Sequence, residues 1–101
     1  MTLDKVCKML KQMKLPLAYN HFKSEQQTPY LIYMVSETES FAADNKIYHK
    51  EDRFAIELYT SKKDTLSEAR VEILLEDHEL YYEKYEVYLE SEKMYQIRYE
   101  I

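Results

Sequence analysis

No glycine occurs among the 101 residues of this chain. Glycine enters left-handed backbone conformations without a steric penalty, so tight turns in this chain must use other residues. Asn45, in the segment "ADNKIYH", is the best candidate for such a turn because asparagine tolerates this conformation better than most residues. The same absence excludes every glycine-rich loop that holds nucleotide phosphates.

The length fits one domain, residues 1–101, with a single modest core. Hydrophobic residues make up 46% of the chain, which favours a globular fold over disorder. No apolar run approaches the roughly 18 residues of a membrane span, and "MTLDKVCKML" lacks the apolar stretch of a secretory signal. The single cysteine, Cys7, suits a reducing cytoplasm and reads as a small buried hydrophobic residue.

The charges are divided unevenly along the chain. Residues 1–63 carry ten Lys or Arg against eight Asp or Glu, a balance of +2, whereas residues 64–101 carry four against eleven, a balance of −7. Phosphate contacts need Lys and Arg, so the acidic second part argues against a nucleic-acid grip there. A solvated face that keeps the protein soluble is the default interpretation.

The N-terminal half predicts one helix and one buried strand. Residues 3–14 are amphipathic, with Thr2 as N-cap and Pro16 as the stop signal, and residues 15–29 are expected to be irregular. Tyr30–Val35 is a continuous apolar run, typical of a strand buried on both faces, which the polar "SETES" should end. The buried helix positions are Leu3, Val6, Cys7, Leu10 and Met13, and Phe41–Ala43 with Ile47–His49 predict a small hairpin.

The C-terminal half predicts a strand, a helix and a final hairpin. In Arg53–Thr60, alternation places Phe54, Ile56 and Leu58 on one face. The capping-box pattern "TLSE" predicts a helix from Thr65 to about Asp77. Its buried stripe would be Leu66, Ala69, Ile73 and Leu74, widened by Val71 and Leu75. The last two strands, Leu80–Glu90 and Met94–Ile101, keep one apolar face if Leu89 faces Tyr95, Val87 faces Ile97 and Tyr85 faces Tyr99.

This order of elements predicts an α+β domain, in which a mostly antiparallel β-sheet carries two helices packed on one face. The sequence contains no recognisable pattern of a catalytic, cofactor or metal site. His21, His49 and His78 are scattered without a second ligand at metal spacing, and Cys7 lacks any nucleophile motif. The sequence gives no reason to expect an enzyme.

Tyrosine occurs eleven times and tryptophan is absent. In the predicted register, Tyr82 and Tyr88 lie opposite the core face, together with Lys84, Glu86 and Glu90. Tyrosines spaced through charge are compatible with a protein interface. A second layer that covers them is an equally good interpretation, and both stay open.

At "ADNKIYHKEDRFAIELYTSKKD", followed by a helix and "YLESEKMYQIRYEI", the chain resembles the small tail terminator proteins of long-tailed bacteriophages and prophages, also called tail completion or tail-to-head joining proteins. The resemblance runs from about Thr28 to the C-terminus. It implies a tail-terminator-like structural protein of the virion neck, present in the host cytoplasm during assembly. No enzymatic activity, cofactor or membrane is implied.

The resemblance also implies partners: a hexameric ring of this chain caps the head-proximal end of the tail tube, between the tail tube protein and the head connector. Genome DNA would pass through the lumen without specific binding. A ring needs heterologous contacts, for which edge strands and the 36–50 segment are candidates. The candidate interface residues are Glu37, Glu39, Phe41, Asn45, Tyr48, His49, Tyr82 and Tyr88, and the acidic second part would line the lumen.

Two alternatives of other kinds stay open. Another neck protein, such as a head-completion adaptor, also forms rings, although more helix would be expected. An acidic phage-encoded inhibitor of a host DNA-handling protein, acting as a DNA mimic, would instead be a monomer or dimer.

Overall fold

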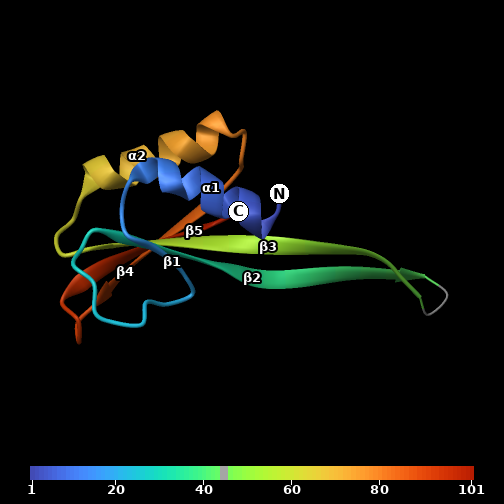
Figure 1. Cartoon of the computed structure of the whole chain (residues 1–101), viewed down its shortest axis with the longest axis horizontal. Coiled ribbons are helices and arrows are strands. Elements are labelled where there is room, and N and C mark those ends of the chain that lie inside the picture. The colour runs from blue at the N-terminus through green and yellow to red at the C-terminus, as the bar shows by residue number, and fades with distance from the viewer. Residues whose placement is uncertain (44–45) are drawn as a thin grey trace.

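A single five-stranded sheet, in the order β1-β2-β3-β5-β4, forms the body of the protein. The computed structural model describes residues 1–43 and 46–101. β1 runs parallel to β2, and every other neighbouring pair is antiparallel. Figure 1 shows both helices on the same face of this sheet, so the predicted α+β fold is confirmed. The elements are α1 (Leu3–Leu10), β1 (Leu17–Tyr19), β2 (Tyr30–Ala43), β3 (Lys46–Thr60), α2 (Thr65–Asp77), β4 (Glu83–Leu89) and β5 (Met94–Glu100).

Helix α1 begins where the sequence predicts. The Thr2 hydroxyl accepts a hydrogen bond from the Lys5 backbone N–H at 3.2 Å, which satisfies one free donor of the first turn. A short 3₁₀ turn, Lys11–Met13, follows the helix, and Lys14 then adopts a left-handed conformation with φ 56° that ends it. The buried face is Val6, Met9, Leu10 and Met13, whereas Cys7 is half-buried and Leu3 is exposed.

Helix α2 has the predicted bounds but a different cap and a different buried face. Asp64, not Thr65, is the N-cap, and its carboxylate accepts hydrogen bonds from the Ser67 N–H at 3.0 Å and the Ser67 hydroxyl at 2.7 Å. The predicted stripe is wrong at Leu66 and Ile73, which are 74% and 57% exposed. The positions turned to the sheet are Ser67, Glu68, Val71, Leu74 and Leu75. A buried glutamate in this row hid the stripe from a pattern of apolar residues.

The core lies between the helices and one face of the sheet. Phe54, Ile56 and Leu58 of β3 are buried there, as the alternation predicts. Ile97 and Tyr99 of β5 pack beside them, and α1 and α2 cover them with their buried faces. Full burial of one such side chain contributes about 1.5–3 kcal/mol, so this cluster is a main source of the protein's stability.

Strands β2 and β3 form one long hairpin, which corrects two predictions. The "SETES" segment does not end the first strand, because β2 continues through it to Ala43 and the pairing with β3 shifts register only at Ser36 and near Ala42. The predicted small hairpin is therefore the far end of a longer one. Residues 44–45, including the predicted turn residue Asn45, lie outside the described residues. In the segment expected to be irregular, β1 adds a short parallel strand beside Leu31–Tyr33.

The β4–β5 register differs by one residue from the prediction. Leu89 faces Met94, Val87 faces Gln96 and Tyr85 faces Arg98. A one-residue slip exchanges the two faces of a strand. Lys84, Glu86 and Tyr88 therefore face the helix side of the sheet, opposite Tyr99, Ile97 and Tyr95.

The second face of the sheet, which we call the outer face, is covered only in part. The loop between β1 and β2 lies on this face below β2 in Figure 1. There Phe22 contacts the ring of Tyr30 at 5.4 Å, and Tyr30 stacks on Tyr59 at 4.8 Å. Ile32, which lies near Phe22 and Tyr30, is buried, and so is Ala55, whereas Tyr85 and Val87 of β4 stay half-exposed on the same face.

Candidate functional site

The hairpin of β2 and β3 projects beyond the rest of the sheet. We call residues 36–43 of β2 and 46–53 of β3 the arm. On one side, β1 accompanies β2 only as far as Tyr33, and on the other side β5 accompanies β3 only to Phe54, which exchanges backbone hydrogen bonds with Ile101. Figure 1 shows the arm reaching past the helices, and the molecule is 51 Å long against 30 and 22 Å in its other dimensions.

The arm has no apolar core among its described side chains. Glu37, Thr38, Ser40 and residues 50–53 are exposed, and Glu39 is half-buried. Two polar contacts join its strands: the Thr38 hydroxyl donates to Asp52 at 2.7 Å, and Arg53 lies 3.4 Å from Glu39. Exposed ion pairs contribute about 0–1 kcal/mol, and an isolated two-stranded hairpin is marginally stable at best. The arm is therefore a structure that a contact with another molecule would stabilise.

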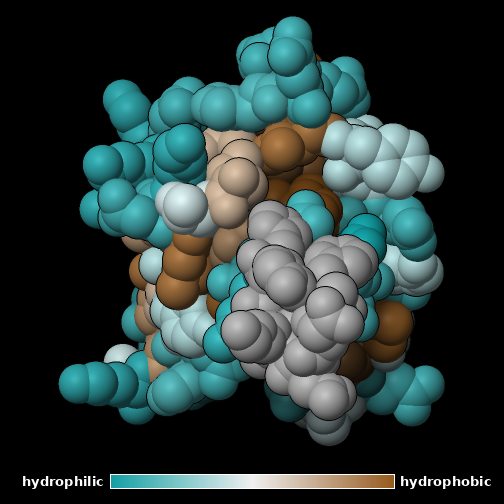
Figure 2. All heavy atoms as spheres, turned by 90° about the vertical axis from the view of Figure 1, so that its right-hand side faces the viewer, coloured by the Kyte–Doolittle hydropathy of each residue, from teal (hydrophilic) through white to brown (hydrophobic). Residues whose placement is uncertain are grey.

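A hollow of about 260 Å³ lies at the base of the arm. Its apolar lining comes from Met1, Phe54, Leu80 and Ile101, and its polar lining from Glu39, Glu51, Asp52 and Arg53 of the arm. Figure 2 faces this end of the molecule and shows hydrophobic residues gathered in a recess that hydrophilic side chains surround. Its volume is below the roughly 300–1,000 Å³ of small-molecule pockets, so the hollow fits a contact surface better than a ligand site.

The candidate interface residues of the 36–50 segment belong to the arm. Glu37 lies opposite Arg53 and Glu39 opposite Glu51, so both are strand residues rather than loop residues. The backbone of Phe41 pairs with that of His49, and Tyr48 lies in the same strand. The side chains of these three residues, and Asn45 altogether, lie outside the described part of the structure. Their role in an interface stays a prediction.

Tyr82 and Tyr88 do not lie on the outer face. Tyr82 is half-buried against the core, where its ring meets the Tyr99 ring edge-on at 5.6 Å and its hydroxyl donates to Glu76 at 3.1 Å. Tyr88 lies on the helix side of β4, with its ring 4.9 Å from that of Tyr95, and remains about half-exposed. Both tyrosines were expected on the outer face from the predicted β4–β5 register, which differs by one residue from the observed register.

Three further exposed apolar side chains of this region lie on the outer face of β4 or just before it. Tyr85 and Val87 are 47% and 48% exposed on the outer face of β4, and Tyr81, just before the strand, is 84% exposed. β4 is also an edge strand, since only β5 pairs with it. We call β4 with Tyr81 the open edge. The correct register would have revealed it in the sequence.

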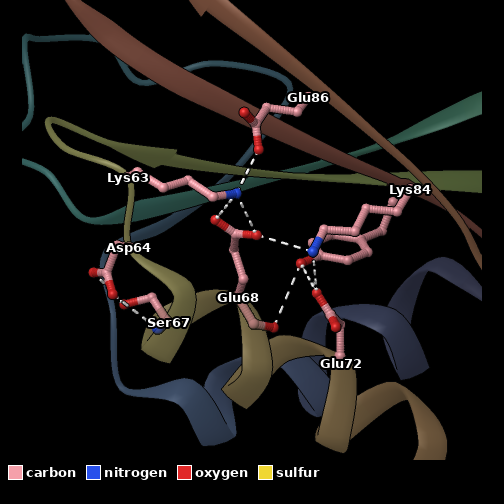
Figure 3. A network of polar contacts seen from close by, with 8 residues as sticks. Lys63, Asp64, Ser67, Glu68, Glu72, Lys84 and Glu86 are labelled. Atoms are coloured by element: carbon pink, nitrogen blue, oxygen red, sulfur yellow. Dashed lines mark hydrogen bonds and ion pairs between the residues drawn. The ribbon is translucent and has the colours of Figure 1, made fainter.

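A network of charges fixes the helix side of β4 to α2, as Figure 3 shows. Glu68 of α2 is only 3% exposed and lies between two lysines. The Lys63 ammonium is 2.7 Å from one of its carboxylate oxygens, and the Lys84 ammonium is 2.9 Å from the other. Lys84 also contacts Glu72 at 2.7 Å, and Lys63 contacts Glu86 of β4. Edge strand and helix are thus joined by paired charge rather than by apolar packing.

The ionisation of these groups follows from their partners. Burial alone would raise the pKa of Glu68, but the hydrogen bonds from Lys63 and Lys84 outweigh it and lower the pKa below its usual value. Burial and the hydrogen bond to Glu72 raise the pKa of Tyr99, whose hydroxyl donates to that carboxylate at 2.7 Å. At neutral pH Glu68 is therefore an anion between the two lysines, and Tyr99 is a neutral donor.

Within residues 1–43 and 46–101, no three His, Cys, Asp or Glu side chains converge as a metal site would require, and none of the described helices has the length and apolar character to span a bilayer. His78 is occupied at the end of α2, where its ring nitrogen Nδ1 lies 2.9 Å from the Leu74 carbonyl oxygen. The chain matches no protein-family model and no curated protein. The features that call for a function are the arm and the open edge.

Proposed function

We propose that this chain is a structural protein of phage assembly that caps the head-proximal end of the tail tube as a ring. The ring would end tube growth and offer a docking surface to the head connector. The observation that carries this proposal is the arm: a paired hairpin that projects beyond the body of the protein and whose described side chains are polar and mostly exposed. The sequence resemblance to tail terminators supplies the setting and the hexameric state.

The arm is costly to order in a single copy of the chain. Ordering its residues costs about 1–2 kcal/mol of backbone entropy per residue, and the described side chains of the arm bury little apolar surface in return. Contact with another copy would supply the missing burial and strand pairing. Such a contact is heterologous when the arm meets a different surface of its neighbour, and it then closes into a ring when the rotation between copies allows it.

The charge distribution suits a lumen for DNA. The acidic excess of residues 64–101 includes exposed carboxylates at the end of α2 and around β4, among them Glu76, Asp77, Glu79, Glu83 and Glu90. Phosphates are repelled by such a surface, so a genome would pass it without binding. The proposal therefore includes no specific DNA site, no cofactor and no catalysis.

Native mass spectrometry of the purified chain, alone and with the tail tube protein of the same phage, tests the proposal. The expected result is a closed ring, hexameric by the resemblance, either alone or on addition of tube protein. A chain that stays monomeric in the presence of tube protein contradicts the proposal. A monomer or dimer that binds a host DNA-handling protein instead would support the inhibitor alternative.

A further inference from the structure

We propose that the arm of one copy pairs, strand to strand, with the open edge of a second copy: the free backbone edge of β3 in the arm beside the free edge of β4. This inference deepens the proposed function, because it takes the second copy as the partner and assigns the two surfaces that meet. It also names the backbone N–H and C=O groups that would form hydrogen bonds between the two copies.

The free edge of the arm can be derived from the pairing at its base. Phe54 exchanges both backbone hydrogen bonds with Ile101, so its N–H and C=O point toward β5. Backbone groups alternate in direction along an antiparallel strand, so Asp52 and Lys50 point to the same side. No described strand lies there beyond Ile101. The opposite edge of the arm is less suited to pairing because β2 carries an irregularity at Ser36.

The same alternation defines the acceptor. Ile101 points toward β3, so Glu100, Arg98, Gln96 and Met94 point toward β4 and bond with its odd-numbered residues. The even-numbered residues Lys84, Glu86 and Tyr88 are left with N–H and C=O groups directed away from the sheet. β4 has seven residues, against three in β1 at the other edge of the sheet. It is therefore the longer open edge of the body.

The two edges match in length and in character. At 3.4 Å per residue, the 46–53 stretch spans about 27 Å and β4 about 24 Å. The arm strand contains Lys46, Lys50 and Arg53 against Glu51 and Asp52, a balance of +1, whereas β4 and the turn after it contain Glu83, Glu86, Glu90 and Glu92 against Lys84 and Lys93, a balance of −2. A docked strand would also extend the sheet beside Tyr85 and Val87, which would lose their half-exposed surface.

One molecule cannot make this contact with itself. In Figure 1 the arm leaves the body at one end, while β4 lies toward the other end of the sheet. Each copy therefore has one donor edge and one acceptor edge at different places, as a head-to-tail ring needs. Full burial of an edge by strand addition also removes the unpaired backbone groups that make long open edges prone to aggregation.

Cross-linking between two single-cysteine chains tests the inference. Both chains carry Cys7→Ser, one with Lys50→Cys and the other with Tyr88→Cys, and they are mixed in equal amounts and treated with a short bismaleimide. We expect the mixed dimer, linked from position 50 to position 88, to dominate over both homodimers. Lys62→Cys, on an exposed residue after β3, is the control and should give only background with either partner.

Each result has a distinct meaning. Position-50 homodimers would show that arms pair with arms, position-88 homodimers that β4 edges pair with each other, and background levels everywhere that neither edge is used. All three overturn the inference. A ring on the tube end with any of these patterns would leave the proposed function standing. Mixed dimers in a chain that never caps a tube would support the edge pairing and contradict the function.

A second variant distinguishes edge pairing from mere proximity. Asp52→Pro in the Lys50→Cys chain removes a free-edge N–H without breaking the ladder to β2. The mixed cross-link should fall about fivefold, as expected for the loss of one backbone hydrogen bond. Asp52→Ala, which keeps the N–H but also loses the contact with Thr38, should retain the yield. Equal yields from both would overturn the strand-to-strand contact.

Discussion

Lys84 lies directly opposite Tyr99 in the β4–β5 pair, and its ammonium nitrogen is 6.0 Å from the centre of the tyrosine ring. The same nitrogen contacts Glu68 and Glu72 of α2. An edge strand would ordinarily present apolar residues to the helix above it. Here a lysine stem covers the tyrosine, and the charged end joins the strand to the helix. The stability of β4 should therefore respond to charge more than to apolar volume.

Replacing the lysine tests this directly. Lys84→Ala leaves the buried Glu68 with one cationic partner, Lys63. Glu72 loses the ion pair that it makes with Lys84. Breaking a buried ion pair costs about 3–5 kcal/mol, but Lys84 is partly exposed, so we expect a loss of about 1–2 kcal/mol in the free energy of unfolding. Urea denaturation measures it. The exposed Lys62→Ala is the matched control and should change the value by less than about 0.5 kcal/mol.

Acid should weaken the same network. The pKa of Glu68 is lowered in the folded chain by Lys63 and Lys84 despite its burial, so this carboxylate contributes stability above its ordinary pKa of about 4.3. That contribution is lost as the pH falls below this value toward the lowered folded pKa. The midpoint of urea unfolding, followed from pH 6 to about pH 3, should fall more steeply for the wild type than for Glu68→Gln. Parallel curves would mean that Glu68 is not the residue responsible.

The start of α2 offers a sharp comparison between two neighbouring residues. Asp64→Ala removes the side chain that accepts both Ser67 hydrogen bonds and should destabilise the protein by about 1 kcal/mol. Thr65→Ala removes only an exposed side chain inside the first turn and should be nearly neutral. Thermal unfolding of the two variants decides between the caps. A larger loss for Thr65→Ala would restore the capping box that the sequence pattern "TLSE" suggests.

That comparison shows where sequence patterns reach their limit. Alternation in Arg53–Thr60 placed the core face of β3 correctly, because three apolar residues recur there at a period of two. In α2 the pattern failed because Glu68 occupies a buried position that only its two lysine partners make tolerable. Those partners come from the loop before the helix and from β4. The contact with Lys84 joins residues sixteen positions apart in the chain and leaves no local signal.

The β4–β5 register failed for a related reason. Both faces of "EKYEVYL" carry charged and aromatic residues. A register that pairs Tyr85 with Tyr99 therefore looks as good as the observed one, in which Lys84 is paired with Tyr99. The arm was underestimated because its described side chains are mostly exposed on both faces, and "SETES" carries no burial pattern. β2 has 14 residues and β3 has 15, so the two strands are nearly equal in length on either side of residues 44–45, as one continuous hairpin requires.

Engineered disulfides can verify the register. Tyr88 and Tyr95 are directly opposite and form a non-hydrogen-bonded pair, whose Cα atoms are about 4.5 Å apart in antiparallel sheets. In a Cys7→Ser background, Tyr88→Cys with Tyr95→Cys should oxidise to an intramolecular disulfide, since this separation lies within the range for such bonds. Leu89→Cys with Tyr95→Cys, the pair favoured by the sequence pattern, should stay reduced. Thiol titration after mild oxidation reads out both.

Hydrogen exchange can show whether the arm awaits a partner. In the monomer, the amides of Glu37, Glu39, Glu51 and Arg53 are held only by the other strand of the arm, and those of Lys50 and Asp52 face the free edge, so all of them should exchange much faster than the paired amides of Tyr30–Val35 and Ala55–Thr60. On assembly, the free-edge amides Lys50 and Asp52 gain acceptors and should slow by at least about tenfold, since a pairing worth 1.4 kcal/mol changes the opening equilibrium by that factor. Amides of α1, which neither edge touches, are the internal control. An arm that is fully protected in the monomer would mean that it is stable by itself and needs no second copy.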